Sequence, residues 1–579
     1  MSLTEIKIKL SNALKTDYFF NVVNELYYDE RSSKKYLTNA LLELHSESVL
    51  NINELYKTLK SKGQYHNFWT LCHVYESLLP NIKAPVIEVM ECIFQLKNDI
   101  GDNISLNQLF SSFTQFCINN EDSYKEAFTI SIDNVDKFSD FISSAIIAGS
   151  SFDTEWSFNK LNSIGSHKAV SARQQAYLSL SRIDLNVNVT INMAFSFLEK
   201  RCLIEKDEAA KSDLFNAAIN LGERDECLWD RIDIVLNTLL IEPSPTLLYS
   251  VSNVAAFDRK NIPYSIKHKL ISFLKNTKVD NQTVLSNIEH LLVKLLKQHE
   301  YEYIEDLLEF LLNKDICISE FNYFNSKLIK NNDEYLHALI TKWFLSGNLN
   351  LCCAVRDLLH DLNIKDIEIK VDVTQVNKLN GMPHFLARKA VGWLFTRPIV
   401  AANFVLSIID VTQENEHEEL KKILFETLLM NYSGELRRYL EKKELTSSLA
   451  VKNTIQNAIT QLNEYFDNME GVWGINEIQC SQQRREQYWE HFQQLMEDAQ
   501  EAVPPSVLSE LFTTQTILYG NSSAVYIYDG NDQPRRSEMK MSKHSYSTEF
   551  PRLDTLDPEG LEYTLRFFRM EVFKNEVNS

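Results

Sequence analysis

The chain has 579 residues and a formal net charge of −20, with 44% hydrophobic and 24% charged residues, which excludes a disordered chain and disfavours non-specific binding to nucleic acid or anionic lipid. Its length fits three or four ordinary domains or one extended array of repeats. The 14 glycines and 12 prolines are few, because average usage gives about 40 and about 29, and this scarcity favours a mostly helical protein over folds built on tight turns.

Helical periodicity dominates the chain from its N-terminus to about residue 515. Apolar residues recur three and four positions apart, as in Ile304, Leu307 and Leu308, and short polar connectors separate the segments. The sequence therefore predicts two helical-repeat regions and a distinct C-terminal region, with boundaries 1–240, 241–503 and 504–579.

One helical segment carries a repeat-like pattern. Val170, Arg173, Ala176 and Leu180 follow one another at helical spacing. This pattern resembles the second helix of HEAT and armadillo repeats, in which a small residue lets the paired helix approach closely. Ala218 follows Ala176 by 42 residues, which matches the usual period of about 40–47. The resemblance implies an α-solenoid, and a non-repetitive helical domain stays open as the alternative.

One segment departs from the helical pattern. Residues 364–376 alternate, with Ile367, Ile369, Val371 and Val373 on one face and polar residues on the other. Alternation of this kind is typical of a strand. We therefore expect a strand-like insertion near residues 364–376 in the second helical region.

The most apolar long stretch is Ala390–Ile409. Arg397, Pro398 and Asn403 interrupt it, so it predicts a buried pair of helices and no membrane span. Gly392 allows another helix to approach closely, and Pro398 suits the start of the second helix. The nine cysteines are odd in number and form no CxxC pair, and the N-terminus has no apolar leader. These features predict a cytoplasmic protein in a reducing compartment.

The C-terminal region changes character after Pro505. Residues 524–528 are β-branched and aromatic, residues 529–532 favour a turn, and residues 536–543 alternate, which together predict a β-hairpin. Asp557 suits an N-cap for a following amphipathic helix. The fold class expected is therefore mainly α, an α-solenoid with a small C-terminal α+β module that contains a β-hairpin.

Two basic surfaces are candidate binding sites. Paired arginines beside aromatic residues suit phosphate, carboxylate or an acidic peptide, although neighbouring acidic residues neutralise them equally well in a hairpin. The residues of the first surface, in the C-terminal region, are Tyr526, Tyr528, Arg535, Arg536, Lys540, Lys543 and Arg552. Those of a second face are Arg388, Lys389, Trp393, Arg397, Arg437 and Arg438, with interleaved glutamates that also fit a solvated surface.

No nucleotide-binding, protease or kinase signature occurs. Arg485 and His491, separated by five residues, resemble the RX4–6H motif of HEPN ribonucleases, in which both act on the phosphodiester. Glu486 departs from that pattern, in which Asn, His or Asp commonly follows the arginine. These two residues are the only catalytic candidates, and a solvated helix face explains them as well.

Two cysteine–histidine groups are candidate sites. Cys352 and Cys353 are adjacent, and adjacent helical residues point about 100° apart, so core cysteines explain them better than a metal site. Cys72 with His73 lies among aromatic residues, and a catalytic Cys–His pair needs a third, orienting group. We therefore expect neither a metal nor another cofactor.

The sequence predicts a non-catalytic scaffold or adaptor that binds protein partners through its helical repeats and its C-terminal cap. One alternative is a nucleic-acid-associated subunit of a multi-protein bacterial defence or processing complex, whose affinity would depend strongly on salt. The other is a HEPN-like ribonuclease. None of the three functions requires a membrane.

Overall fold

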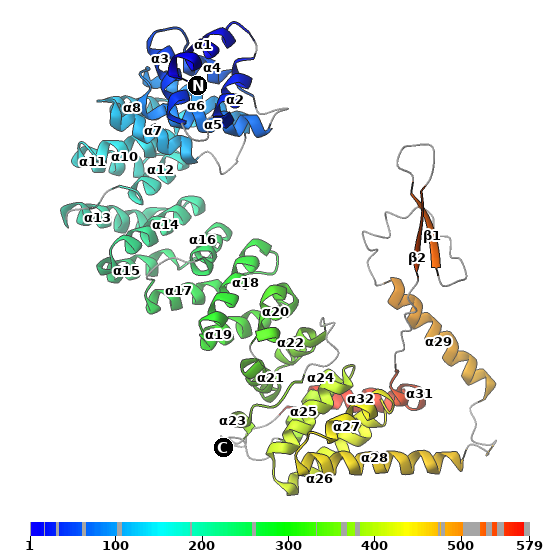
Figure 1. Cartoon of the computed structure of the whole chain (residues 1–579). Coiled ribbons are helices and arrows are strands. Elements are labelled where there is room, and N and C mark those ends of the chain that lie inside the picture. Colours follow the sequence, from blue (N-terminus) through cyan, green and yellow to red (C-terminus); the bar gives the residue numbers. More distant parts are fainter. Residues whose placement is uncertain are drawn as a thin grey trace. The chain divides into compact units, whose positions relative to one another are not determined.

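A computed structural model describes residues 2–16, 18–29, 34–60, 65–100, 107–183, 185, 188–257, 262–331, 333–360, 368–376, 383–472, 475, 481–501, 522–527, 535–540 and 549–572. Helix follows helix through most of these residues (Figure 1). The chain divides into two compact units, Met1–Leu311 and Leu312–Ser579. This division differs from the region boundaries expected after residues 240 and 503, which stay a prediction.

Unit 1 is a series of helices. Its elements are α1 (Leu3–Ala13), α2 (Phe19–Asp29), α3 (Lys34–Ser46), α4 (Ile52–Lys57), α5 (Tyr65–Leu78), η1 (Leu79–Asn81), α6 (Val86–Ile100), α7 (Asn107–Asn119), α8 (Ser123–Asp133), α9 (Val135–Phe138), α10 (Phe141–Ser150), α11 (Thr154–Gly165), α12 (Val170–Leu180), α13 (Asn188–Ile204), α14 (Glu208–Arg224), η3 (Glu226–Leu228), α15 (Trp229–Leu239), α16 (Pro245–Ala256), α17 (Tyr264–Leu274), α18 (Gln282–Lys297) and α19 (Tyr301–Leu312).

The helices of unit 1 pack in two rows. In one row α7 contacts α10, and α12, α14, α16 and α18 follow, each against the next. In the other row α11 contacts α13, which contacts α15. Side-chain caps start several of these helices: Asp153, Asp207 and Ser244 accept hydrogen bonds from the backbone N–H groups three residues ahead. Helices packed in series in this way are compatible with a helical-repeat architecture.

The repeat is shorter than expected. The helices α12, α14, α16 and α18 begin at residues 170, 208, 245 and 282, so the steps are 38, 37 and 37 residues. The 42-residue step between Ala176 and Ala218 is therefore not the repeat. Both alanines are buried, but they are the seventh residue of α12 and the eleventh of α14. The difference of four residues is about one helical turn, which keeps both on the same face.

Unit 2 contains the remaining elements. They are η4 (Ile318–Phe321), α20 (Asn322–Asn331), α21 (Asp333–Ser346), α22 (Leu349–His360), α23 (Val373–Val376), α24 (Pro383–Leu394), α25 (Pro398–Val411), η5 (Glu414–Glu416), α26 (His417–Lys422), the π-helix η6 (Ile423–Leu429), α27 (Glu435–Glu444), α28 (Leu449–Glu470), α29 (Gln482–Glu501), β1 (Ser522–Ile527), β2 (Arg535–Lys540), α31 (Arg552–Leu556) and α32 (Pro558–Met570).

The helices α24 and α25 form the buried pair predicted from the sequence. Most of their residues are buried, and Pro398 is the first residue of α25. They pack on each other and on neighbouring helices of unit 2. No helix in the described part of the chain is long and apolar enough to cross a membrane.

The strand predicted for residues 364–376 is wrong in the described residues 368–376. Residues 368–372 belong to neither helix nor strand, and residues 373–376 form α23. Side chains of neighbouring helices bind the backbone there: Asn403 donates to the carbonyl of Ile369 at 3.1 Å, and the N–H of Val371 donates to Ser407 Oγ at 2.9 Å. Ile369 and Val371 are buried, so the alternating pattern reflects one-sided burial without strand pairing.

The fold class predicted for the C-terminus is also wrong. The amphipathic helix α32 packs on α24 and on α31, which places it in the helical body of unit 2. Residues 522–527 and 535–540 pair antiparallel with each other, with Ser522 opposite Lys540. A pair of strands is thus present, but no α+β module in which α32 packs on these strands is seen in the described residues. The reason is that the apolar face of α32, which carries Leu561, Leu565 and Phe568, is buried on another helix.

Candidate binding groove and its buried ion cluster

A groove of about 470 Å³ lies along α12, α14, α16 and α18 in unit 1. Most of its lining side chains carry amide or hydroxyl groups, Asp213 is the one acid among them, and none is Lys or Arg. The lining residues are Gln174, Ala209, Ser212, Asp213, Asn216, Pro245, Thr246, Tyr249, Ser250, Asn281 and Thr283. The row of helices thus presents a polar and almost uncharged surface.

Hydrogen bonds between successive helices hold the floor of the groove. Gln174 Nε2 donates to Asp213 Oδ2 at 2.8 Å, which joins α12 to α14. The hydroxyl groups of Ser212 and Ser250 lie 2.5 Å apart, and Asn216 Nδ2 donates to Ser250 Oγ at 3.3 Å, which joins α14 to α16. These contacts fix the spacing of the polar groups that face the groove.

Two groups of the groove keep hydrogen-bonding capacity for a ligand. Tyr249 is 45% exposed, and its hydroxyl group has no described partner. Asp213 is tied only to Gln174 by a described hydrogen bond, so one of its oxygens is left as an acceptor. Burial raises the pKa of Asp213, the hydrogen bond from Gln174 opposes that rise, and Asp207 adds to it. A ligand that donates a hydrogen bond to this carboxylate would therefore stabilise its charged form.

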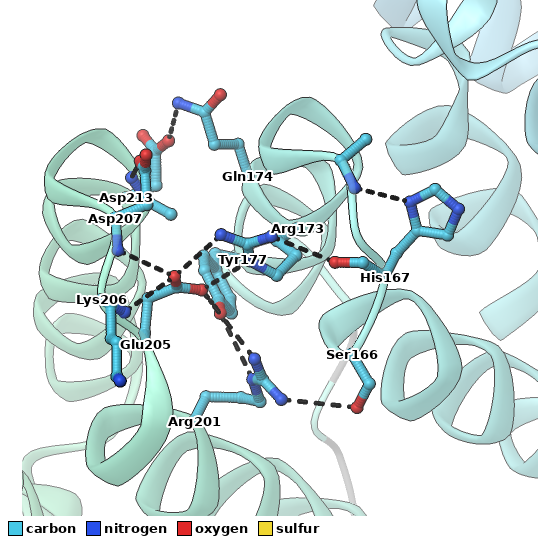
Figure 2. Close-up of polar contacts among 12 residues, drawn as sticks. Ser166, His167, Arg173, Gln174, Tyr177, Arg201, Glu205, Lys206, Asp207 and Asp213 are labelled. Atoms are coloured by element: carbon cyan, nitrogen blue, oxygen red, sulfur yellow. Dashed lines mark hydrogen bonds and ion pairs between the residues drawn. The ribbon is translucent and has the colours of Figure 1, made fainter.

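A buried ion cluster lies beside the groove, because Arg173 and Gln174 are neighbours on α12. Figure 2 shows the side chains of Arg173 and Tyr177 converging on Glu205. Arg173 binds both Glu205 oxygens, at 2.9 and 3.0 Å, and the Tyr177 hydroxyl group donates to Oε2 at 2.6 Å. The backbone N–H groups of Lys206 and Asp207 each donate to Oε1 at 3.1 Å. Glu205 therefore accepts five hydrogen bonds.

Arg201 completes the cluster from α13. Its Nε donates to the Tyr177 hydroxyl group at 3.3 Å and its Nη1 to Ser166 Oγ at 3.4 Å. The side chain of Glu205 is only 2% exposed. Burial raises the pKa of Glu205, but the hydrogen bonds from Arg173 and Tyr177 outweigh burial and lower the pKa to about 2. The carboxylate is thus charged and fully satisfied.

The cluster is built to hold helices in place. Arg173 also donates to the carbonyls of His167 and Lys168, both at 3.0 Å, so one side chain links the start of α12 to the end of α13. No group of three or more His, Cys, Asp or Glu residues that fits a metal ion occurs in the part of the chain that the structure describes. The arrangement supports a rigid binding surface beside it.

The second basic face predicted from the sequence has an intramolecular partner. Arg388 binds Glu571 through Nε and Nη2, both at 2.8 Å, and also binds Glu419. Lys389 is fully buried and donates to the carbonyl of Arg569 at 2.5 Å. Two of these partners, Glu571 and Arg569, belong to the C-terminal segment. The sequence did not indicate that this segment contacts the second basic face.

Of the other residues of that face, only Trp393 is described in contact with the C-terminal segment. The ring of Trp393 has the guanidinium groups of Arg356 and Arg569 near its face. Arg437 pairs with Glu441 at 2.9 Å on α27. Arg397 precedes α25, and Arg438 donates to the carbonyl of Gly434. Their role in binding an external partner stays a prediction.

The C-terminal surface is described in part. Tyr526 lies in β1, and Arg535, Arg536 and Lys540 lie in β2, while Tyr528 and Lys543 lie outside the described residues. Arg552 is placed clearly: its guanidinium group lies 5.0 Å from the ring centres of both Tyr465 and Phe466 on α28. Arg552 therefore packs within unit 2, and binding by the rest of the surface stays a prediction.

The catalytic candidates share one helix. Arg485 and His491 both belong to α29, and the side chain of His491 is exposed.

The adjacent cysteines differ in burial. Cys352 is buried and Cys353 is half-buried, with its thiol 3.6 Å from Asp357 Oδ2. Cys352 is thus a core cysteine, as the sequence predicted, whereas Cys353 lies at the edge of the core.

No protein-family model and no curated protein matches this chain.

The sequence interpretation missed both the groove and the ion cluster. A signal was present, since Ser212 and Ser250 are separated by 38 residues, within one residue of the 37-residue step between the starts of α14 and α16. Polar residues that recur at the repeat period on one helical face mark a surface that the repeats share. That signal becomes readable only once the correct period is known.

Proposed function

We propose that this protein is a non-catalytic scaffold of the HEAT or armadillo type, and that the groove along α12, α14, α16 and α18 binds an extended polypeptide segment of a protein partner. The polar lining of the groove carries this proposal. Amide and hydroxyl groups both donate and accept hydrogen bonds, as the backbone of an extended peptide does. The series of packed helices supports a similarity to such repeats. The helix starts are 37 to 38 residues apart, so these repeats are shorter than usual.

The charge of the groove favours a peptide over a nucleic acid. Proteins neutralise phosphates with Lys and Arg, and neither residue lines the groove, whereas Asp213 does. A phosphate backbone would meet a carboxylate there. The nucleic-acid alternative therefore draws no support from this surface.

Replacing Tyr249 with alanine should weaken peptide binding by about tenfold or more, because exposed tyrosines are frequent anchors of interfaces. Peptides would first be selected on the full-length protein from a displayed library of unstructured sequences. Their affinities for the wild type and for Tyr249→Ala would then be measured by calorimetry. Tyr18→Ala is the matched control, since Tyr18 is 66% exposed in unit 1 and is not among the residues that line the groove.

Two results would contradict the proposal. In one, no peptide is selected on the wild type. In the other, Tyr249→Ala and Tyr18→Ala bind the selected peptides equally well. Cross-linking of a selected peptide to α14 or α16 would locate the binding site independently of the affinities.

A further inference from the structure

A second cavity of unit 1, of about 420 Å³, lies among α2, α3, α5 and α7. It is separate from the groove and shares no lining residue with it. Its described lining includes Tyr27, Leu37 and Val74 and six further residues with polar side chains. They are Thr38, His73, Glu76, Ser77, Gln108 and Ser112.

A buried carboxylate belongs to the lining of this cavity. The side chain of Glu76 is 8% exposed, and its one described hydrogen bond joins Oε2 to His73 Nδ1 at 2.7 Å. The side chain of His73 is 58% exposed and lies toward solvent. One oxygen of Glu76 is therefore left without a described partner, although buried carboxylates normally accept several hydrogen bonds.

The hydroxyl group of Ser112 is a second polar group that lines the cavity. Ser112 is 6% exposed, and no partner of its hydroxyl group is described. Gln108, one turn earlier on α7, lines the cavity as an exposed residue. The cavity thus brings together a carboxylate, a hydroxyl group and an amide that all can accept hydrogen bonds.

A second buried carboxylate of unit 1, that of Glu205, shows which hydrogen-bond donors Glu76 lacks. Glu205 accepts hydrogen bonds from Arg173, from Tyr177 and from backbone N–H groups, and its pKa falls to about 2. No Lys or Arg is among the described residues that line the cavity around Glu76. Burial raises the pKa of Glu76, and the hydrogen bond to His73 opposes that rise only in part. A cation in the cavity would offset the cost of burying this charge.

We propose that this cavity binds a cationic organic group, an alkylammonium or a guanidinium, with Glu76 as its counter-ion and Ser112 and Gln108 as further acceptors. The volume of about 420 Å³ admits a basic amino-acid side chain or a small free amine. A metal ion fits less well, because the described residues contain no group of three metal-binding side chains.

Cys72, next to His73 in the chain, does not supply a nucleophile to this cavity. The sequence drew attention to Cys72 beside His73, and Glu76 is the third group that would orient the histidine. The thiol of Cys72, however, is buried, and burial raises its pKa well above the ordinary value. A protonated, buried thiol is inert, so the pair of His73 and Glu76 serves binding only.

The test is a calorimetric titration of the full-length protein with four probes. The free amines are n-butylammonium and methylguanidinium chloride, and the peptides are acetyl-Ala-Lys-Ala-amide and the same peptide with norleucine in place of lysine. We expect the cationic probes to bind and the norleucine peptide not to bind. Tighter binding of the lysine peptide than of butylammonium would identify a basic side chain of a partner as the ligand, and equal binding would identify a free amine.

Glu76→Gln should weaken binding of the cationic probes at least tenfold, because it removes the counter-ion and keeps the shape. Glu126→Gln removes an equal charge from an exposed position of α8 and should leave binding unchanged. Gln108→Lys changes an exposed residue, so the fold should persist, and its ammonium group should occupy the cavity and abolish binding. The proposal is overturned if no cationic probe binds, or if both Glu76→Gln and Gln108→Lys bind the probes as the wild type does.

Discussion

Replacing Glu205 with glutamine should lower the free energy of unfolding of the helices α12–α14 by about 3 kcal/mol or more. Breaking a buried ion pair by changing one partner typically costs about 3–5 kcal/mol, because the other charge is left buried without compensation. Here two guanidinium groups would remain, on Arg173 and Arg201, with side chains 13% and 8% exposed. A neutral amide would also return fewer of the five hydrogen bonds that the carboxylate accepts.

The same residue gives the stability of this region a dependence on acid. The pKa of Glu205 is lowered from its ordinary value of 4.5 to about 2 in the folded protein. Its contribution is therefore complete above about pH 4.5 and is lost as the pH falls toward about 2, since the unfolded chain binds the proton first. By linkage, the stability lost in this way is on the order of 3 kcal/mol. Glu205→Gln should lack this part of the acid dependence.

Hydrogen exchange of the full-length protein, followed by mass spectrometry between pH 7 and pH 3, measures both effects. Peptides from α12, α13 and α14 should lose protection in Glu205→Gln at neutral pH and should show a smaller change on acidification than in the wild type. The control is Glu199→Gln on α13, the helix that ends just before Glu205. Glu199 is 50% exposed and lies 3.5 Å from Arg231, and exposed pairs contribute about 0–1 kcal/mol. Equal losses of protection in the two variants would contradict the buried role of Glu205.

The sequence predicted the local features of the fold better than its long-range contacts. Asp557 caps α32 by accepting from the N–H of Gly560 at 3.1 Å, as its position before Pro558 indicated. The close approach expected at Gly392 is also present, because a Cβ atom there would lie 2.9 Å from that of Phe568. What the sequence did not indicate was that the approaching helix is α32. An amphipathic helix fits many apolar surfaces, so its pattern alone names no partner.

The candidate sites show the same limit. Arg173 was singled out as part of a repeat pattern, but its partner Glu205 lies 32 residues further along the chain. That contact follows from the packing of α12 beside the end of α13, which depends on the true repeat length. Glu76 had no sequence signal at all, because a glutamate in a helix is usually exposed. Burial and the absence of cationic neighbours around a cavity are properties of the packed helices.

Replacing Phe568 with alanine should release α32 from α24. Phe568 is 8% exposed and packs directly against Gly392. Truncating a buried phenylalanine costs about 3–5 kcal/mol. The docked helix has only 13 residues, and helices of about that length are marginal in water without tertiary packing. Loss of the contact should therefore unfold α32 as well as separate it from α24.

Polar contacts at the end of α32 depend on the same docking. Arg388 holds the carboxylate of Glu571, and Lys389 donates to the carbonyl of Arg569. Burial lowers the pKa of Lys389, and undocking removes the carbonyl that its ammonium group binds. Arg569 Nε in turn donates to the carbonyl of Gly392 at 2.6 Å. These bonds form only when α32 lies on α24, which makes its docking an all-or-none contact.

Phe567→Ala is the matched control, because Phe567 is the neighbouring residue, has the same side chain and is 52% exposed. Hydrogen exchange of peptides covering residues 558–570 should be fast in Phe568→Ala and close to that of the wild type in Phe567→Ala. Limited proteolysis should cut the same segment only in Phe568→Ala. Wild-type protection of α32 in both variants would show that the polar contacts of Arg388, Lys389 and Arg569 suffice to hold this helix. Loss of protection in both variants would instead place Phe567 in an interface as well, since an exposed side chain on a docked helix should be dispensable.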